Sequence, residues 1–441
     1  MKKTVIILLV LCLAATAVIG GVSVRSGEFF VPQPTAAVSD EAPSAVGAAD
    51  SPADFVITDG EYHSPASEAE SEPQPEPQGE TEPATSVGRL DYEALYALHD
   101  KDDMVMRIGG QEERWGDYFY VLYSQCSQIE NYFNSMAAYY GMLFNWNDPI
   151  EEDSEETFAE TATETAASLM TQLAGLELFA EEHDITLGED SQAAIEELKK
   201  ADIVGALGED GTEEAFREAL RKVYLSDEMY DRIIRQNVLY QEVFNQLYGE
   251  KAEKLSDEEA LQYLEENGYV SAAHILFKNT DPETGEPLDE EALAAKKAEL
   301  EAILAELNAI EDDQERAAAF LEKIPEISED SGSAHYPEGY TFTEGRMVPE
   351  FENAAKELEE YAVSEIVETT YGYHILLRLP LKADAIVEYS STTGDARTAR
   401  MLAANELYGK QLQDFADSLE LTWLPGCEEP TLLDYITEKE A

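Results

Sequence analysis

The chain is short of positive charge. Its 441 residues include 29 lysines and arginines against 93 aspartates and glutamates, which gives a formal net charge of −64 at pH 7. Such a chain repels phosphate groups, so the composition argues against binding to nucleic acid or to anionic lipid headgroups. The apolar fraction of 44% is ordinary for a globular protein, and the length suffices for roughly two or three domains.

Cysteine is also scarce. Three cysteines occur, and Cys12 lies in a hydrophobic N-terminal run, which leaves Cys126 and Cys427 for the rest of the chain. Their spacing fits no metal site, and one pair does not make a disulfide framework. A single Cys126–Cys427 disulfide is left open.

The chain begins with a positively charged and then an apolar stretch. Met1–Lys3 precedes about 21 uncharged residues, Thr4–Val24, and at 1.5 Å per residue these nearly span a bilayer core of about 30 Å. Residues 1–25 are therefore predicted to be a signal peptide, cleaved near Ala15–Ala17, or a membrane anchor. A lipoprotein attached through Cys12 is a third alternative. By the positive-inside rule the two lysines keep the N-terminus in the cytoplasm, so the rest is expected to be exported.

Lysine and arginine are absent between Ser26 and Gly88, where Pro, Glu, Ser, Ala and Gln dominate. This composition cannot bury enough apolar surface to offset the loss of chain entropy, so residues 26–88 are predicted to be a disordered acidic stalk. Prolines and like charges keep such a stalk extended.

Apolar residues at i, i+3, i+4 spacing predict that residues 89–266 are mainly helical. One strand and turn are expected first, at Met104–Gly110. Helices are then expected from Trp115, over 155–182, 191–200, 213–223 and 226–248, and after a capping box of Ser256 and Glu259. Aromatic side chains here invite a peptide-binding interpretation, but the core of a helical bundle is favoured. These residues are Tyr118, Phe119, Tyr120, Tyr123, Tyr132, Phe133, Tyr139, Tyr140, Phe144 and Trp146.

After Gly268 strands and helices alternate, which predicts an α+β domain with a small mixed sheet over residues 267–382. The expected strands are Val270–Phe277, Ile366–Glu368 and His374–Leu379, and the expected helices are Leu288–Leu307, Asp313–Lys323 and Met347–Leu358. An amphipathic helix is predicted at Asp395–Leu419 and a strand at Glu420–Leu424. Residues 428–441 are expected to be a surface tail.

Four motifs follow one another in this region over about 105 residues. They are Ala-His-Ile-Leu at Ala273–Leu276, Ser-Glu-Asp-Ser-Gly-Ser at Ser328–Ser333, Gly-Arg-Met-Val-Pro-Glu-Phe-Glu at Gly345–Glu352, and Thr-Thr-Tyr-Gly-Tyr-His-Ile-Leu at Thr369–Leu376. Their order and spacing resemble the parvulin-type peptidyl-prolyl isomerases. The arrangement of the whole chain is similar to the SurA/PrsA-like exported foldases.

The resemblance implies an α+β parvulin domain inserted in an all-α SurA/PrsA-like chaperone domain, with residues 383–427 packing back on the helical region 89–266. It also implies the residues of a site. The catalytic residues would be His274, Asp330, Thr369 and His374, and the proline pocket would comprise Phe342, Met347 and Phe351. No metal or cofactor is expected, because rotation about an X-Pro bond requires no covalent step.

One stretch departs from the family pattern. Where members usually carry a Gly-Gly-Asp-Leu-Gly turn, this chain has His335–Phe342. The leucine that closes the pocket is missing, and whether Tyr340 replaces it is left open. The loop Asn279–Pro287 is acidic, so a preference for phosphoserine-proline is not expected.

The expected function is that of an extracytoplasmic foldase, which isomerises X-Pro bonds in exported proteins and binds unfolded chains. Its partners would be unfolded or partly folded exported proteins, with the membrane reached only through the N-terminal segment. The alternative is a holdase or assembly chaperone with little or no catalysis, which uses the parvulin fold to dock peptides. The clients, the fate of the N-terminal segment and a homodimer are left open.

Overall fold

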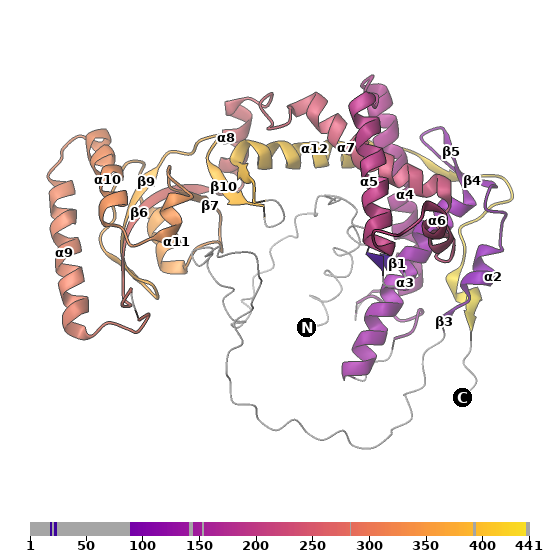
Figure 1. Ribbon diagram of the computed structural model, residues 1–441, viewed down its shortest axis with the longest axis horizontal. Coiled ribbons are helices and arrows are strands. Elements are labelled where there is room, and N and C mark those ends of the chain that lie inside the picture. The colour runs from indigo at the N-terminus through magenta and orange to yellow at the C-terminus, as the bar shows by residue number, and fades with distance from the viewer. Residues whose placement is uncertain are drawn as a thin grey trace, which may run out of the picture. The chain divides into compact units, whose positions relative to one another are not determined.

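The computed structural model describes residues 18–19, 22–23, 89–140, 144–151, 154–282, 284–390 and 394–437, without the side chains of 135–140. Its folded part divides into two compact units. We call residues 89–247 with 406–437 the helical unit, and residues 248–405 the sheet unit (Figure 1).

Most of the predicted N-terminal segment 1–25 and all of the predicted stalk 26–88 lie outside the described residues. Within the segment, β1 (Val18–Ile19) and β2 (Val22–Ser23) pair antiparallel. In the part of the chain that the structure describes, no helix is both long and apolar enough to cross a membrane.

Helices make up most of the helical unit. They are α2 (Tyr92–Tyr96), α3 (Trp115–Tyr140), α4 (Phe158–Glu182), α5 (Glu189–Leu207), α6 (Glu213–Arg221), α7 (Asp227–Tyr248) and the C-terminal part of α12 (Ala399–Asp417). The predicted helices are confirmed, and α5 is longer than expected because it continues to the break at Gly208. A capping box of Thr157 and Glu160 starts α4.

The expectation of an all-α region is incomplete, because two small sheets belong to the helical unit. β4 (Met104–Ile108) lies between β5 (Gln111–Arg114) and β12 (Leu421–Trp423), and β3 (Arg89–Leu90) pairs with β13 (Ile436–Thr437). The prediction that 428–441 is only a surface tail is wrong. The 3-10 helix η4 (Leu432–Tyr435) buries Leu432, and backbone pairing with β3 fixes the strand that follows.

Aromatic side chains fill the core of the helical unit. Trp115, Tyr118, Phe119 and Trp146 have no exposed surface, so the prediction that these rings form a core is confirmed for them. The side chains of Tyr139 and Tyr140 lie outside the described ones. Cys126 is buried, Cys427 is half-buried, and both are free thiols, so the disulfide left open does not form.

The sheet unit is α+β, as predicted. Its helices are α8 (Asp257–Glu266), α9 (Glu290–Asn308), α10 (Asp313–Ile327), the 3-10 helix η3 (Ser331–Ala334) and α11 (Pro349–Glu357). Its strands are β6 (Val270–Lys278), β7 (Tyr340–Phe342), β8 (Val367–Thr369), β9 (Gly372–Leu379), β10 (Ile386–Tyr389) and β11 (Ala396–Thr398). The capping box of Ser256 and Glu259 starts α8, as expected.

The central sheet has the order β7-β6-β9-β8. It was expected to be mixed, but each of its pairings is antiparallel. A tight turn joins β8 to β9, and at its end Gly372 has φ +139°. A Cβ atom there would lie 2.1 Å from the carbonyl oxygen of Phe277, so the glycine of the Thr-Thr-Tyr-Gly motif allows the close approach of β6.

Side chains of β6 alternate between two faces of the sheet. Ala273, Ile275 and Phe277 pack with α9 and α10, whereas Ala272 packs with α11. Because the period of a strand is two, His274 lies on the α11 face, where its ring contacts that of Phe351.

The predicted helix 395–419 begins later than expected, at Ala399. Residues Ala396–Thr398 pair with β10 instead, and the Thr398 hydroxyl accepts a hydrogen bond from the N–H of Met401 in the first turn of α12. This pairing gives the sheet unit a β10–β11 hairpin that the sequence did not predict.

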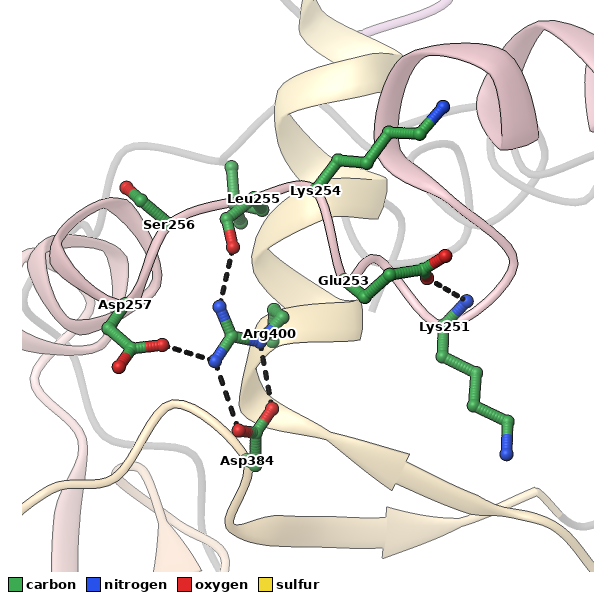
Figure 2. Close-up of a pocket in the computed structure, with 8 residues that line it drawn as sticks. All are labelled: Lys251, Glu253, Lys254, Leu255, Ser256, Asp257, Asp384 and Arg400. Carbon is green, nitrogen blue, oxygen red and sulfur yellow. Dashed lines mark hydrogen bonds and ion pairs between the residues drawn. The ribbon is translucent and has the colours of Figure 1, made fainter.

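Arg400, at the start of α12, joins three segments of the sheet unit (Figure 2). Its guanidinium donates to the carbonyl oxygen of Leu255 and to the carboxylates of Asp257 and Asp384. The side chain is only 9% exposed. An open polar pocket surrounds it, lined by Lys251, Glu253, Lys254, Leu255, Ser256, Asp257, Asp384 and Arg400.

We predict that Arg400→Met weakens this junction by about 2 kcal/mol, since hydrogen bonds to a charged group are lost while both aspartates can be solvated. Hydrogen exchange of the Ala399 and Arg400 amides, which donate to Ala385 and Ala383, should become roughly thirtyfold faster. Arg235→Met, at an exposed position of α7, is the control. Unchanged protection of both amides in Arg400→Met would contradict the prediction.

Candidate active site

Two histidines from distant parts of the chain meet on neighbouring strands. In the register of β6 and β9, His274 lies opposite Leu376 and His374 lies opposite Leu276. The two Nδ1 atoms are 3.2 Å apart. The side chains are nearly buried, at 8% exposed for His274 and 3% for His374.

Asp330 reaches this pair because the segment after α10 runs along β6. The N–H of Glu329 donates to the carbonyl oxygen of Leu276, and the N–H of Leu276 donates to the Ser328 hydroxyl. β7 pairs only with the first residues of β6, so this edge is open to residues 328–330. Asp330 Oδ2 then lies 2.9 Å from His274 Nε2.

Thr369 lies at the other end of the histidine pair. It is the last residue of β8, and its Oγ1 is 2.9 Å from His374 Nε2. The same oxygen accepts a hydrogen bond from the N–H of Tyr371, so its own proton is free to point at the imidazole.

Tyr340 occupies the stretch that departs from the family pattern. Its hydroxyl donates to Asp330 Oδ2 over 2.6 Å, and its ring centroid lies 5.5 Å from that of His274. Gly332 leaves room for it, because a Cβ atom there would lie 2.2 Å from the hydroxyl oxygen. Sequence reasoning left the place of Tyr340 open, and nothing in its spacing indicated a contact with Asp330.

The direction of the hydrogen bonds is fixed at Asp330. An ionised Asp330 can only accept, so His274 Nε2 carries a proton and donates to it, as the Tyr340 hydroxyl does. Between the two Nδ1 atoms one imidazole donates and the other accepts. The Thr369 hydroxyl and His374 Nε2 share the next hydrogen bond.

Burial and the neighbouring charges shift the pKa values of the groups at this site. Burial lowers the pKa of His374 to about 3, assisted by the positive charge of a protonated His274. Burial alone would raise the pKa of Asp330, but hydrogen bonds from His274, Tyr340 and the N–H of Gly332, together with the positive charge of a protonated His274, outweigh it and lower that pKa to about 2. Burial and the charge of Asp330 raise the pKa of Tyr340, so its hydroxyl keeps its proton.

The predicted pocket residues lie on the same face of the sheet. The Phe351 ring centroid is 5.1 Å from that of His274 and 5.7 Å from that of His374. Phe342 packs on Phe351 at 5.8 Å, and both are 3% exposed. Met347 is half-buried against the same cluster. The structure thus brings all seven predicted site residues together and adds Tyr340.

We predict that the free energy of unfolding falls as the pH is lowered from 6.5 towards 3. The folded state keeps His374 neutral down to about pH 3, whereas in the unfolded chain its pKa has the ordinary value of 6.5. The unfolded state therefore binds more protons in this window, and this group contributes at most about 1.4 kcal/mol per pH unit. Denaturant titrations from pH 7 to 4.5 measure the effect.

His374→Gln isolates this contribution from that of the many carboxylates. The stability advantage of the wild type over this variant should shrink as the pH falls, while His335→Gln, at an exposed position, should follow the wild type. An advantage that is constant between pH 7 and 4.5 would show that folding does not lower the pKa of His374.

We further predict that Tyr340→Phe raises the pKa of Asp330 from about 2 towards the ordinary value of 3.8, because a hydrogen bond that lowers it is lost. Carboxyl ¹³C NMR titration measures this shift. Tyr336→Phe, which leaves the Tyr340–Asp330 bond intact, should change nothing. An Asp330 pKa that is equal in wild type and Tyr340→Phe would rule out the role assigned to the hydroxyl.

Comparison with known proteins agrees with the geometry. Residues 274–379 match the family model of the PPIC-type PPIASE domain, also called rotamase. The foldase protein PrsA of Halalkalibacterium halodurans is 34% identical over 172 residues, which cover 38% of this chain and 44% of that protein. PrsA of Clostridium botulinum (strain 657 / Type Ba4) is 22% identical over 294 residues, which cover 64% of this chain and 78% of that protein.

Solved structures give matches of the same kind. The peptidylprolyl isomerase PrsA of Bacillus anthracis is 19% identical, with a TM-score of 0.21, over 56% of this chain and 95% of that one. Peptidyl-prolyl isomerase ESS1 of Candida albicans is 29% identical, also with a TM-score of 0.21, over 26% and 64%. These scores are too low to support a conclusion. The ordered motifs and the family match identify residues 274–379 as a parvulin-type peptidyl-prolyl isomerase domain, in a chain that is similar to the foldase protein PrsA over part of that protein's length.

Proposed function

We propose that this chain is an extracytoplasmic foldase, whose sheet unit isomerises X-Pro bonds in exported proteins and which also binds their unfolded segments. One observation supports it most. An ionised carboxylate, Asp330, is held by a histidine and a tyrosine hydroxyl beside a cluster of apolar rings.

The reaction asks for stabilisation of a twisted amide. Resonance makes the peptide bond planar and imposes a barrier of about 18–20 kcal/mol. As the bond twists, the nitrogen lone pair becomes localised and the carbonyl oxygen loses negative charge. Each 1.36 kcal/mol removed from the barrier raises the rate about tenfold, so modest electrostatic effects suffice.

We assign Asp330 the central role. A fixed negative charge facing the carbonyl of the X-Pro bond disfavours the planar form, in which that oxygen is most negative, relative to the twisted form. His274 and Tyr340 position the carboxylate, and His374 and Thr369 orient the His274 ring. No covalent bond is made or broken.

The apolar residues would supply the proline pocket. Met347, Phe342 and Phe351 lie on the histidine face of the sheet, and removal of water from the amide strengthens the effect of the Asp330 charge. Of these three residues Met347 is half-buried, so its flexible side chain can contact the proline ring of a client.

The other parts of the chain are proposed to deliver clients. Residues 89–266 and 383–427 would form the chaperone region around the isomerase domain 267–382, with 26–88 as the stalk. Export through the N-terminal segment 1–25 would place this assembly outside the cytoplasmic membrane. The strong negative charge of the chain suits client segments that are not acidic.

The proposal predicts turnover by the full chain. Exchange NMR on a short Ala-Pro peptide should show catalysed isomerisation, and Asp330→Asn should reduce kcat/KM by roughly ten- to a hundredfold, because the charge is lost at nearly constant shape. Circular dichroism would verify that the variant folds. No catalysis by the wild type would favour the docking chaperone over the enzyme.

Asp312→Asn is the matched control. Asp312 caps α10 in the same unit through its side-chain oxygen, and asparagine caps a helix about as well. It should keep the wild-type rate. Equal rates for wild type and Asp330→Asn would remove Asp330 from the mechanism while leaving the activity itself established.

A further inference from the structure

We propose that Tyr336 and Tyr389 form a side-chain subsite beside the isomerase site, which takes an aromatic residue next to the proline of the client. This inference rests on the proposed isomerase function. The subsite would decide which X-Pro bonds are favoured. Part of it lies outside the matched family region, because Tyr389 follows the last residue of that region.

The β10–β11 hairpin brings Tyr389 to the site. It follows the matched region 274–379, and β10 packs against β7, the strand that begins with Tyr340. The hydroxyl of Tyr389 donates to the carbonyl oxygen of His335 over 2.8 Å. This bond ties the hairpin to the stretch that replaces the glycine-rich turn of the family.

Aromatic rings then connect the hairpin to the histidine pair without a break. Tyr389 and Tyr336 meet edge to face at 5.7 Å, and Tyr336 lies at 4.7 Å and 34° from Tyr340. Tyr340 in turn lies 5.5 Å from His274. A client residue beside the proline therefore meets these rings next.

The outer rings remain accessible. Tyr389 is 36% exposed and Tyr336 is half-buried, whereas the rings closest to the histidines, such as Phe351, are almost fully buried. Aromatic faces and edges left open at a surface favour the edge-to-face and offset contacts that another aromatic ring provides. Rigid rings also bind with little loss of side-chain entropy.

Charges near the subsite argue for an uncharged occupant. Glu388, next to Tyr389, is paired with Arg346 at 3.4 Å and with Arg397 at 3.5 Å. Glu338 is paired with Lys382 at 3.3 Å. Because Glu388 and Glu338 already have basic partners, they do not attract a basic side chain of the client. Contact between rings therefore decides which client residue binds here.

Peptides that differ in one residue test the subsite. We would measure kcat/KM of the full chain by exchange NMR on Ala-Ala-Phe-Pro-Ala and Ala-Ala-Ala-Pro-Ala. A second pair of peptides would carry the phenylalanine or the alanine directly after the proline. In one of the two pairs phenylalanine should be favoured about fivefold. Tyr389→Ala should bring this ratio near one, with the rate on the alanine peptides changed less than twofold.

Three further variants test whether the tyrosine rings form the subsite. Tyr389→Phe keeps the ring and should keep the ratio. Tyr336→Leu should lower it as Tyr389→Ala does, which tests the subsite even where Tyr389→Ala disturbs the hairpin. Tyr373→Ala, a tyrosine beside Lys297 on the opposite face of the sheet, should leave the ratio unchanged.

The outcomes separate the two proposals. If the wild type turns over none of the peptides, the isomerase function is overturned. If it turns them over but phenylalanine is not favoured, or the ratio survives both Tyr389→Ala and Tyr336→Leu, the subsite is overturned and the isomerase function stands.

Discussion

A run of hydrogen bonds from Thr369 through His374 and His274 to Asp330 holds the site together. The ionised Asp330 accepts at one end of the run, so His274 donates to it from Nε2 and shares one hydrogen bond with His374 through Nδ1. The run also depends on the register of β6 and β9, since a shift by one residue would turn one histidine to the other face. The fold of the sheet unit and the protonation of its site are therefore coupled.

The stretch from His335 to Tyr340 changes the character of this site. Where related domains have a flexible glycine-rich turn, the chain places rings, and Tyr340 closes the polar end of the site by donating to Asp330. Gly332 is small for the same reason, since it leaves space for that hydroxyl. With the altered turn the site is still closed at its polar end, and its aromatic surface extends towards the β10–β11 hairpin.

Basic residues are few in this chain, and two of its arginines each contact more than one acidic side chain. Arg232 links Glu113 and Glu177 within the helical unit, and Arg400 joins three segments of the sheet unit. Acidic residues meanwhile occupy the first turns of many helices, for example Glu213 in α6, where they interact favourably with the helix dipole. Arg232 thus provides a partner for the buried carboxylate of Glu113, whereas Arg400 is itself nearly buried and pairs with two exposed aspartates.

The sequence by itself determined the isomerase domain and its helices, and it predicted the site residues that the structure brings together, because His274, Asp330 and His374 stand in ordered motifs and periodicity reports local structure. It did not predict the antiparallel sheet, the pairing of β3 with β13 or the β10–β11 hairpin. The order of the sheet and the pairing of β3 with β13 depend on contacts between residues far apart in the chain, which no local pattern encodes. Only the tertiary structure decided that Tyr340 donates to Asp330 and that Tyr389 lies beside Tyr336, since both contacts arise where the hairpin and the altered turn fold against one sheet edge.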